Sequence, residues 1–215
     1  LDIATGGGHT ALVFAPHVAR MIASDLTRQM LDQVDKQVAE KGLSNVETKE
    51  ADAEQLPFDD ASFDLVTCRI APHHFPDIPK FVSEVHRVLK PGGVFIWREP
   101  VSDLWLWKLL RSAVYRLSPM LDHETEKPLT YDETVPLLKE TGFTVTQWKT
   151  YGFLGFCIFM NSDVLFFNRF FRFIPGIRAI TRLFTRFDDW CTRRSLLRRA
   201  GLQVIGKATK PNTGT

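Results

Sequence analysis

The sequence predicts a doubly wound α/β fold built on a mostly parallel, seven-stranded sheet. Short apolar runs alternate with helical periods over the first hundred residues, and the loops between them are short. A length of 215 residues, with 44% hydrophobic and 24% charged side chains, suits a single globular core. Parallel strands joined by right-handed crossovers place a ligand site at the carboxyl ends of the strands.

Five apolar runs predict the first five strands, at residues 1–3, 20–24, 46–50, 63–68 and 94–97. Helical periods between them predict helices at residues 9–18, 27–40 and 78–89. We expect Gly42 to end the second of these helices, because glycine adopts a left-handed C-cap conformation easily. The Lys-Pro-Gly-Gly sequence at residues 90–93 is expected to break the third helix before the fifth strand begins.

The rest of the chain predicts two further strands, at residues 143–149 and 202–208. An aromatic helix is predicted over residues 103–121, and another helix over residues 130–141. Thr130 and Glu133 fit a capping box at the start of that second helix. A helical insertion, residues 151–201, separates the last two strands.

The net charge of +2 conceals an asymmetry, since residues 1–150 carry about −6 and residues 151–215 about +8. Cys68, Cys157 and Cys191 are widely spaced and form no metal-ligand cluster with the six histidines, so a reducing, cytoplasmic compartment and no metal are expected. The chain opens with Leu-Asp-Ile and not with a basic region before an apolar run, so no secretory signal is expected. Leu1 reads as the middle of a buried strand, which indicates sequence upstream of it.

The segment LDIATGGGHT joins the first strand to the first helix through three glycines. Glycines let the backbone approach a ligand, and a helix N-terminus offers unpaired N–H groups. Gly6, Gly8 and Ala11 also satisfy the dinucleotide fingerprint GxGxxG/A, and a tight turn without any ligand is the alternative. Asp25 ends the second strand, where a carboxylate can accept hydrogen bonds from ribose hydroxyls, although NAD enzymes use the same device. Its alternative role is to cap the next helix.

A polar segment, EADAEQLPFDDASFDLV, follows the third strand. Its Asp52 could accept a hydrogen bond from an adenine amino group, and the backbone N–H of Ala53 could bind a ring nitrogen. The order of these motifs, followed by HHF and EVHRVLKPGG, resembles the S-adenosylmethionine (SAM)-dependent methyltransferases related to the ubiquinone and menaquinone biosynthesis methyltransferases. The resemblance covers residues 1–100, and Ala4 stands where many members have glycine. An NAD-dependent oxidoreductase is disfavoured, because LPF-D-SFD and LKPGG are not expected there.

The resemblance implies a Rossmann-like class I methyltransferase fold and assigns the binding of the cofactor SAM to residues at the carboxyl ends of the strands. The glycine-rich loop should wrap the methionine end of SAM with Asp2, Ala4, Gly6 and Gly8. Asp25 should hold the ribose, and Leu26 and Met30 should pack on adenine, although simple core packing is the alternative for Met30. Asp52 and Ala53 should read the adenine edge. Arg69 and Ile70 should line the methionine side.

The sulfonium of SAM is already activated, so the protein mainly has to place the acceptor in line and exclude water. A general base helps when the acceptor is a hydroxyl. His73 and His74 follow the fourth strand, and Glu99 ends the fifth, so these three are the candidate catalytic residues. The alternative is that the histidines pack the loop. No metal is required.

The basic, aromatic residues beyond 100 bear on the acceptor. Trp105, Trp107, Leu109, Leu110 and Tyr115 stand beside Lys108, Arg111 and Arg116, and ten phenylalanines lie between Phe153 and Phe187 among arginines. This pattern suits a helix in a membrane interface, with residues 151–200 on the inner face of the membrane. An aromatic core closing over the pocket explains the same residues. Nucleic-acid binding is disfavoured, because the front of the chain is acidic and no RNA-binding module is visible.

The sequence therefore predicts one methyltransferase domain over residues 1–215. Residues 1–100 form its SAM-binding core, 101–150 the acceptor side, 151–201 the insertion, and 202–215 the last strand and tail. The expected reaction is methyl transfer by in-line displacement to a small, hydrophobic acceptor such as a quinone precursor, a lipid or a natural-product intermediate. A soluble polar metabolite is an alternative acceptor. A non-catalytic SAM-binding module is the alternative function.

Overall fold

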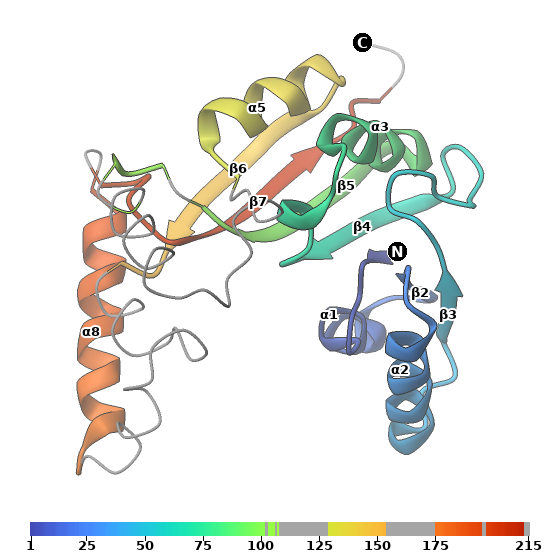
Figure 1. Ribbon diagram of the computed structural model, residues 1–215, viewed down its shortest axis with the longest axis horizontal. Coiled ribbons are helices and arrows are strands. Elements are labelled where there is room, and N and C mark those ends of the chain that lie inside the picture. Colours follow the sequence, from blue (N-terminus) through green and yellow to red (C-terminus); the bar gives the residue numbers. More distant parts are fainter. Residues whose placement is uncertain (102, 106, 108–128, 154–174, 195–196, 213–215) are drawn as a thin grey trace. The chain divides into compact units, whose positions relative to one another are not determined.

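The structure is a computed structural model that describes residues 1–101, 103–105, 107, 129–153, 175–194 and 197–212. Its centre is a seven-stranded sheet in the order β3-β2-β1-β4-β5-β7-β6 (Figure 1). The strands are β1 Asp2–Ile3, β2 Met21–Asp25, β3 Val46–Glu50, β4 Phe63–Arg69, β5 Leu89–Pro100, β6 Thr144–Tyr151 and β7 Gln203–Thr209. The α-helices are α1 His9–Phe14, α2 Arg28–Lys41, α3 Ile78–Val88, α5 Tyr131–Glu140 and α8 Ile177–Thr192. Two 3-10 turns complete the set, η1 Ala15–His17 and η2 Pro72–His74.

Two compact units make up the chain. The first comprises residues Leu1–Glu99, Asp132–Gln147 and Gly206–Thr215, and the second comprises Pro100–Tyr131 and Trp148–Ile205. Every candidate site residue predicted from the sequence lies in the first unit. The single domain over residues 1–215 remains a prediction.

The predicted sheet and its mostly parallel character are confirmed. Strand β1 pairs in parallel with both β2 and β4, and the pairs β2–β3 and β4–β5 are also parallel. Strand β7 runs the other way: the N–H of Gly92 bonds to the carbonyl of Lys210 at one end of β5, and Val101 bonds to Leu202 at the other. The sheet therefore has one antiparallel strand, β7, which lies between β5 and the edge strand β6.

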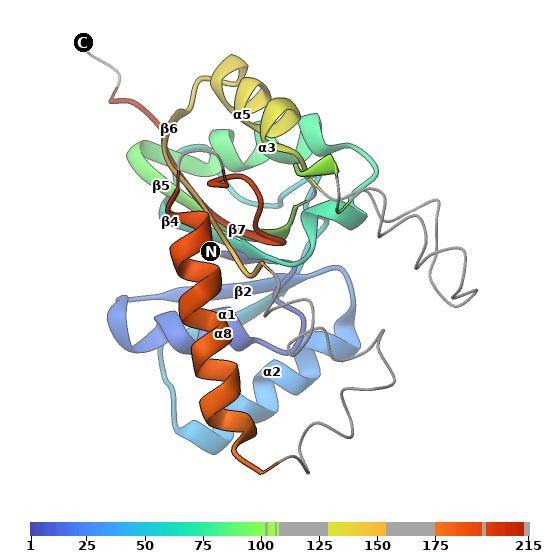
Figure 2. The ribbon, with the colours of Figure 1, turned by 90° about the vertical axis from the view of Figure 1, so that its left-hand side faces the viewer.

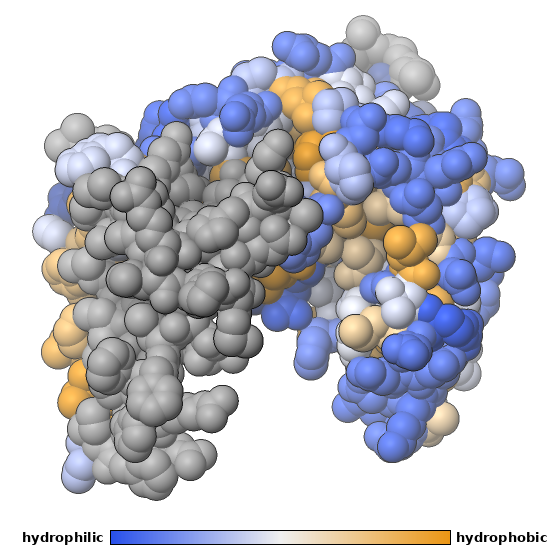
Figure 3. Space-filling model, viewed as in Figure 1, coloured by the Kyte–Doolittle hydropathy of each residue, from blue (hydrophilic) through white to orange (hydrophobic). Residues whose placement is uncertain are grey.

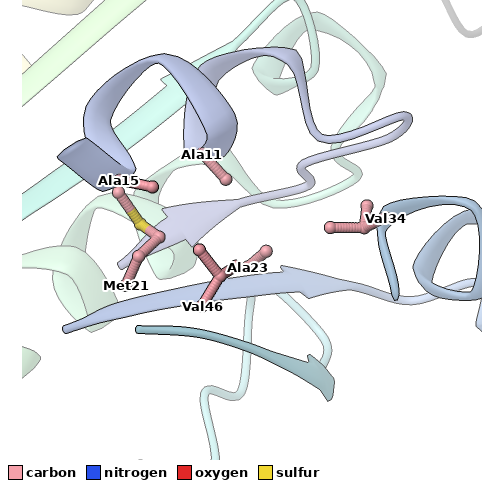
Figure 4. Close-up of a cluster of buried hydrophobic side chains, with 6 residues drawn as sticks. All are labelled: Ala11, Ala15, Met21, Ala23, Val34 and Val46. Atoms are coloured by element: carbon pink, nitrogen blue, oxygen red, sulfur yellow. The ribbon is translucent and has the colours of Figure 1, made fainter. Parts of the chain in front are cut away.

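Helices α1 and α2 cover one face of the sheet and α3 and α5 the other (Figures 1 and 2). On the first face, small side chains let α1 approach β2 closely, since Ala11, Ala15 and Ala23 are completely buried (Figure 4). Val34 of α2 and Met21 of β2 complete this packing. Gly42 ends α2 with φ 63°, as predicted. The exposed side of α2 is charged and appears blue in Figure 3.

The Lys-Pro-Gly-Gly segment behaves differently from the prediction. Strand β5 begins at Leu89, directly after α3, and not at Val94. The ladder shifts its register here, because Phe63 pairs with Leu89 whereas Leu65 pairs with Val94. The four residues between Leu89 and Val94 bulge out of the ladder, and Gly92 takes a left-handed conformation there, with φ 79°. Lys210 supports the junction by donating to the carbonyls of His86 and Leu89, each at 2.8 Å, which satisfies the end of α3.

Some predictions fall outside the described residues. They concern residues 108–121 of the predicted aromatic helix and residues 154–174 of the insertion. The second range includes Cys157 and most of the ten phenylalanines between Phe153 and Phe187. The described part of the insertion contains α8, in the second unit. No α-helix within the described ranges combines the length and apolar character needed to cross a bilayer.

Candidate active site

The candidate site lies where β2, β1, β4 and β5 end side by side in the first unit. The register aligns Ile3 with Ser24 on β2 and with Cys68 on β4, and Arg69 with Arg98 on β5. Because parallel strands end at the same edge, the loops after them meet there. The sequence predictions Ala4–Gly8, Asp25–Leu26, Arg69–His74 and Glu99 are thus brought to one edge.

The glycine-rich loop turns through left-handed backbone conformations. Its φ angles are 50° at Ala4, 52° at Gly6 and 78° at Gly8. A Cβ on Gly8 would lie 3.0 Å from a methyl of Val34, so this glycine permits close packing on α2. A Cβ on Gly6 would have no atom within 4 Å, so the backbone of Gly6 borders open space. The loop can therefore approach a ligand at Gly6.

Asp2 supports this loop from inside the protein. Its side chain is buried, and its carboxylate accepts hydrogen bonds from the hydroxyls of Thr5 and Thr67, both at 2.6 Å. Burial raises the pKa of Asp2, while the bonds from Thr5 and Thr67 act in the opposite direction. Asp2 therefore connects the loop to β4. Thr5 and Thr67 were not among the residues predicted from the sequence, and the pairing that places Thr67 opposite Asp2 is visible only in the structure.

Asp25 ties the end of β2 to the loop. One carboxylate oxygen accepts the N–H of Gly6 at 2.9 Å, and the other accepts the N–H of Thr27 at 3.0 Å. Since a carboxylate offers about four acceptor positions, roughly two remain for ligand hydroxyls. Helix α2 has Thr27 as its N-cap and no side-chain cap bond, so Asp25 does not take the capping role. It holds the N–H of the N-cap residue and keeps the capacity for the ribose role.

Three apolar side chains at this edge are exposed: 69% for Leu26, 39% for Met30 and 39% for Ile70. Core packing of Met30 was the alternative, and this exposure disfavours it. Ile70 also has φ 53°, a conformation that is strained for a β-branched residue. Such strain is concentrated at binding and catalytic sites. The edge therefore offers apolar surface next to the polar groups of Asp25 and Gly6.

The segment after β3 is held by two residues of α3 that the sequence analysis did not assign. Arg87 donates to Glu84 and to the carbonyls of Leu56 and Phe58, at 2.7–2.9 Å. Glu84 in turn accepts the N–H of Leu56 at 2.7 Å. The LPF and EVHR motifs therefore form one structural unit, which the sequence indicated only through the presence of both motifs.

That unit carries the predicted adenine-reading pair. Asp52 is exposed, and one of its carboxylate oxygens accepts the N–H of Glu54 at 2.9 Å. Ala53 is buried. The bridge between Asp52 and Gln55 makes this a tight turn, which fixes the position of the Asp52 carboxylate relative to β3.

Glu99 and His73 form a buried pair. Glu99 is fully buried, and its carboxylate lies 2.7 Å from Nδ1 of His73 and accepts the N–H of Ala71 at 2.8 Å. His73 is 8% exposed, whereas His74 is exposed and its ring lies 3.9 Å from that of His73. A carboxylate therefore orients the ring of His73.

Other chemistry is less well supported at this edge. Burial raises the pKa of the Cys68 thiol well above its ordinary value, and the charges of Glu99 and Asp2 add to that effect, so the thiol stays protonated. Within the described ranges, no three His, Cys, Asp or Glu side chains are placed to hold a metal ion. Two hollows of about 340 and 430 Å³ lie at the opposite edge, by Arg20, Ile22 and Phe63, and contain none of the predicted residues.

Comparison with known proteins places this site in a family. The family described as "Methyltransferase domain" matches residues 1–97. A demethylmenaquinone methyltransferase of Symbiobacterium thermophilum is 30% identical over 174 residues, which cover 69% of each chain. An uncharacterized methyltransferase of Bacillus subtilis is 50% identical over 96 residues, 45% of this chain, but the match spans only 38% of that relative's length.

A solved structure extends the similarity over the fold. The crystal structure of a putative methyltransferase from Bacillus halodurans aligns with 98% of this chain and 91% of its own, with a TM-score of 0.66 and 28% identity. The chain belongs to the class I SAM-dependent methyltransferase family. The resemblance drawn from the motifs is therefore confirmed, and SAM is the cofactor of this family.

Proposed function

We propose that the chain binds SAM at the edge formed by the glycine-rich loop, Asp25 and the loops after β3 and β4. The observation that carries the proposal is the Asp25–Gly6 contact at 2.9 Å, which aligns a carboxylate with an open backbone. When bound, SAM supplies an activated methyl group. The chain's own groups bind its ribose through Asp25 and contact its apolar parts through Leu26, Met30 and Ile70.

The binding site is tested by calorimetric titration with SAM and two matched pairs of variants. Asp25→Asn leaves one acceptor oxygen for two N–H groups and any ribose hydroxyl, so we expect about 10- to 100-fold weaker binding from losing a charged hydrogen bond. Asp32→Asn, which removes an exposed carboxylate of α2 paired with Arg28, is the control. Equal affinities for the two variants would contradict the assignment.

The glycine-rich loop is tested in the same way by Gly6→Ala and Gly42→Ala. Both glycines have positive φ, 52° and 63°, and neither would place a Cβ within 4 Å of another atom. The backbone strain is therefore matched, while only Gly6 borders the proposed site. We expect Gly6→Ala to weaken SAM binding and Gly42→Ala to preserve it, and the reverse result would refute the role of the loop.

We propose further that the chain transfers the methyl group to a small, hydrophobic acceptor of the quinone-precursor type. The relative from Symbiobacterium thermophilum, named a demethylmenaquinone methyltransferase, supports this choice. Reduced demethylmenaquinone and the polar amine glycine are compared as acceptors of labelled methyl. Methylation of glycine alone would favour a soluble polar metabolite. Tight SAM binding with no transfer to either would favour a non-catalytic SAM-binding module.

We propose also that α8 brings the protein to an anionic membrane surface, from which such an acceptor would be drawn. Ile180, Leu183, Phe187 and Trp190 form an exposed apolar stripe at helical spacing, 38–67% exposed, and orange atoms follow α8 in Figure 3. Exposed Arg182, Arg186 and Arg193 lie beside the stripe. Apolar side chains flanked by arginines suit an interfacial helix.

Sedimentation with vesicles of neutral and of anionic lipid tests this surface. We expect binding only to anionic vesicles, weakened by salt, because surface attraction is screened within about 10 Å at 0.1 M salt. Leu183→Gln should weaken it, while Thr185→Gln, away from the stripe, should not. Absence of binding at low salt would refute the membrane role and favour a packing role for the stripe.

A further inference from the structure

The Glu99–His73 pair has features of a built proton-accepting device. Glu99 is the only charged side chain that is 0% exposed among the described residues, and a buried carboxylate is costly unless fully hydrogen-bonded. Its two partners supply that compensation: the N–H of Ala71 at 2.8 Å and Nδ1 of His73 at 2.7 Å. The fold therefore places a buried, hydrogen-bonded carboxyl group against Nδ1 of the His73 ring.

The contact with Glu99 determines the tautomer of His73 when Glu99 is ionised. An ionised carboxylate can only accept, so Nδ1 then carries the proton of the 2.7 Å contact. In the neutral ring the lone pair is then on the other nitrogen, Nε2. His73 lies in η2, three residues after the strained Ile70 and beyond the carboxyl end of β4, so its ring belongs to the edge where SAM is proposed to bind.

We propose that His73 is the general base of the reaction, that Glu99 is its positioning residue, and that the methyl acceptor therefore presents a hydroxyl group. The inference rests on the proposed SAM-dependent function and deepens it by naming the chemistry of the acceptor. An acceptor that is already a neutral nucleophile without a proton to lose would need no oriented base. A buried carboxylate–histidine pair at the edge would then have no use.

Proton transfer begins at the acceptor hydroxyl. Its O–H bond breaks, the proton passes to Nε2 of His73, and the electron pair stays on the oxygen. That pair, or the carbon ortho to the oxygen in a phenolic ring, forms the new bond to the methyl carbon while the C–S bond breaks and its pair returns to sulfur. The imidazolium is stabilised by Glu99. In attack through carbon, the ring C–H proton is lost afterwards to water, which restores the aromatic ring.

The surroundings of the pair are compatible with this role. Titratable groups on the neighbouring elements include His74 beside the His73 ring, Cys68 on β4, whose thiol stays protonated, and Asp2 on β1, which accepts from Thr5 and Thr67. Arg69 on β4 and Arg98 on β5 stand at the same edge. Glu99 is therefore the carboxylate that faces His73. Its effect on the ring is specific to one nitrogen.

The first test is the ring tautomer, measured by long-range ¹H–¹⁵N correlation on the full chain. The wild type should show a protonated Nδ1 and an unprotonated Nε2 for His73. In Glu99→Gln one carboxyl oxygen becomes an N–H donor, so with Ala71 on the remaining oxygen, His73 must accept at Nδ1 and carry its proton on Nε2. We expect this reversal, with SAM affinity within about twofold of wild type. A protonated Nε2 in the wild type would overturn the proposal.

The second test separates a base from a merely structural residue. Two phenols serve as acceptors: 2-naphthol, which is mostly protonated at neutral pH, and 4-nitrophenol, whose nitro group lowers the pKa so far that a substantial share is ionised there. A phenol with a pKa near that of tyrosine, about 10, is ionised to only about one part in 10³ at pH 7. We therefore expect His73→Gln and Glu99→Gln to lower kcat for 2-naphthol by about 10²- to 10³-fold with little change in KM, and kcat for 4-nitrophenol by less than about fivefold.

The control is His86→Gln, a half-buried histidine that packs on Phe143 away from the edge, which should change neither rate. Equal losses for both phenols in His73→Gln would make His73 structural and overturn the proposal. So would a wild type that binds SAM and methylates neither phenol. A wild type that binds no SAM would instead refute the proposed function, which the calorimetric titration reports separately.

Discussion

Replacing Arg87 by Met should destabilise the protein far more than the same change at Arg20. Arg87 makes five hydrogen bonds of 2.7–2.9 Å, to Glu84, Asp60 and the carbonyls of Leu56 and Phe58. Its side chain is 29% exposed and that of Glu84 is 18% exposed. Arg20 makes the same forked contact with Glu47, at 3.1 and 2.7 Å, but both side chains are more than 60% exposed.

The magnitude follows from these contacts. Asp60 is 79% exposed, so its bond contributes little. Loss of the other four bonds leaves two carbonyls and the half-buried carboxylate of Glu84 without their partner, which costs about 3 kcal/mol in total. For a chain of this size that loss lowers Tm by roughly 6–12 °C. Met keeps the apolar stem, so packing is largely preserved. The exposed Arg20 pair should cost less than about 1 kcal/mol.

The assay is urea denaturation of wild type, Arg87→Met and Arg20→Met, followed by circular dichroism at low and high salt. The Arg20 variant should lose its small effect at high salt, because exposed pairs are screened. The Arg87 variant should keep most of its effect. Equal destabilisation in the two variants, or a loss below about 1 kcal/mol for Arg87→Met, would refute the reasoning that Arg87 holds the segment after β3.

Two further predictions concern the same unit. Arg87 lowers the pKa of Glu84. The contribution of this pair to stability is therefore present above the ordinary carboxyl pKa and is lost as pH falls through the lowered folded value. The difference in stability between wild type and Arg87→Met should shrink between pH 7 and pH 3, and a constant difference would contradict this. A Cβ on Gly206 would overlap the ring of buried Trp97, so Gly206→Ala should cost about 1–3 kcal/mol in denaturant and alter the tryptophan fluorescence; an unchanged midpoint would show that Trp97 shifts freely.

Local rules predicted the elements of the first unit because each rule acts within a few residues. Gly42 ends α2 as a left-handed C-cap, and the helical period that placed Val34 inside is confirmed by its full burial. The predicted start of β5 was wrong, because the strand begins at Leu89 and not at Val94. Proline and glycine end a helix, as they do here, but a strand can also carry them in a bulge. Whether these residues form a loop or a bulge depends on their pairing with Phe63 and Leu65 in the neighbouring strand.

Strand direction could not be predicted from the pattern of β7. Its alternating buried and exposed residues are compatible with either direction, and the reversal is visible only in contacts such as Gly92 with Lys210. The parallel direction of β1, β2 and β4 was predictable, because helices intervene between them in the chain.

The site was predicted as a set of positions but not as a set of contacts. The sequence placed His73 and Glu99 at one edge and gave them alternative roles as bases. That Glu99 turns inward, is fully buried and bonds to Nδ1 of His73 depends on the pairing of β4 with β5, which joins residues 26 apart in the chain. The same holds for Arg87: the LPF and EVHR motifs were visible in the sequence, but the bonds from Arg87 to the carbonyls of Leu56 and Phe58 were not.

Calorimetric titration of the chain with SAM, S-adenosylhomocysteine and NAD side by side decides whether the edge beside Asp25 and Gly6 binds SAM. We expect binding of the first two ligands in the micromolar range, corresponding to about −8 kcal/mol, and no binding of NAD. Binding of NAD alone would contradict the claim, because the fingerprint glycines and the strand-ending acid would then serve a dinucleotide.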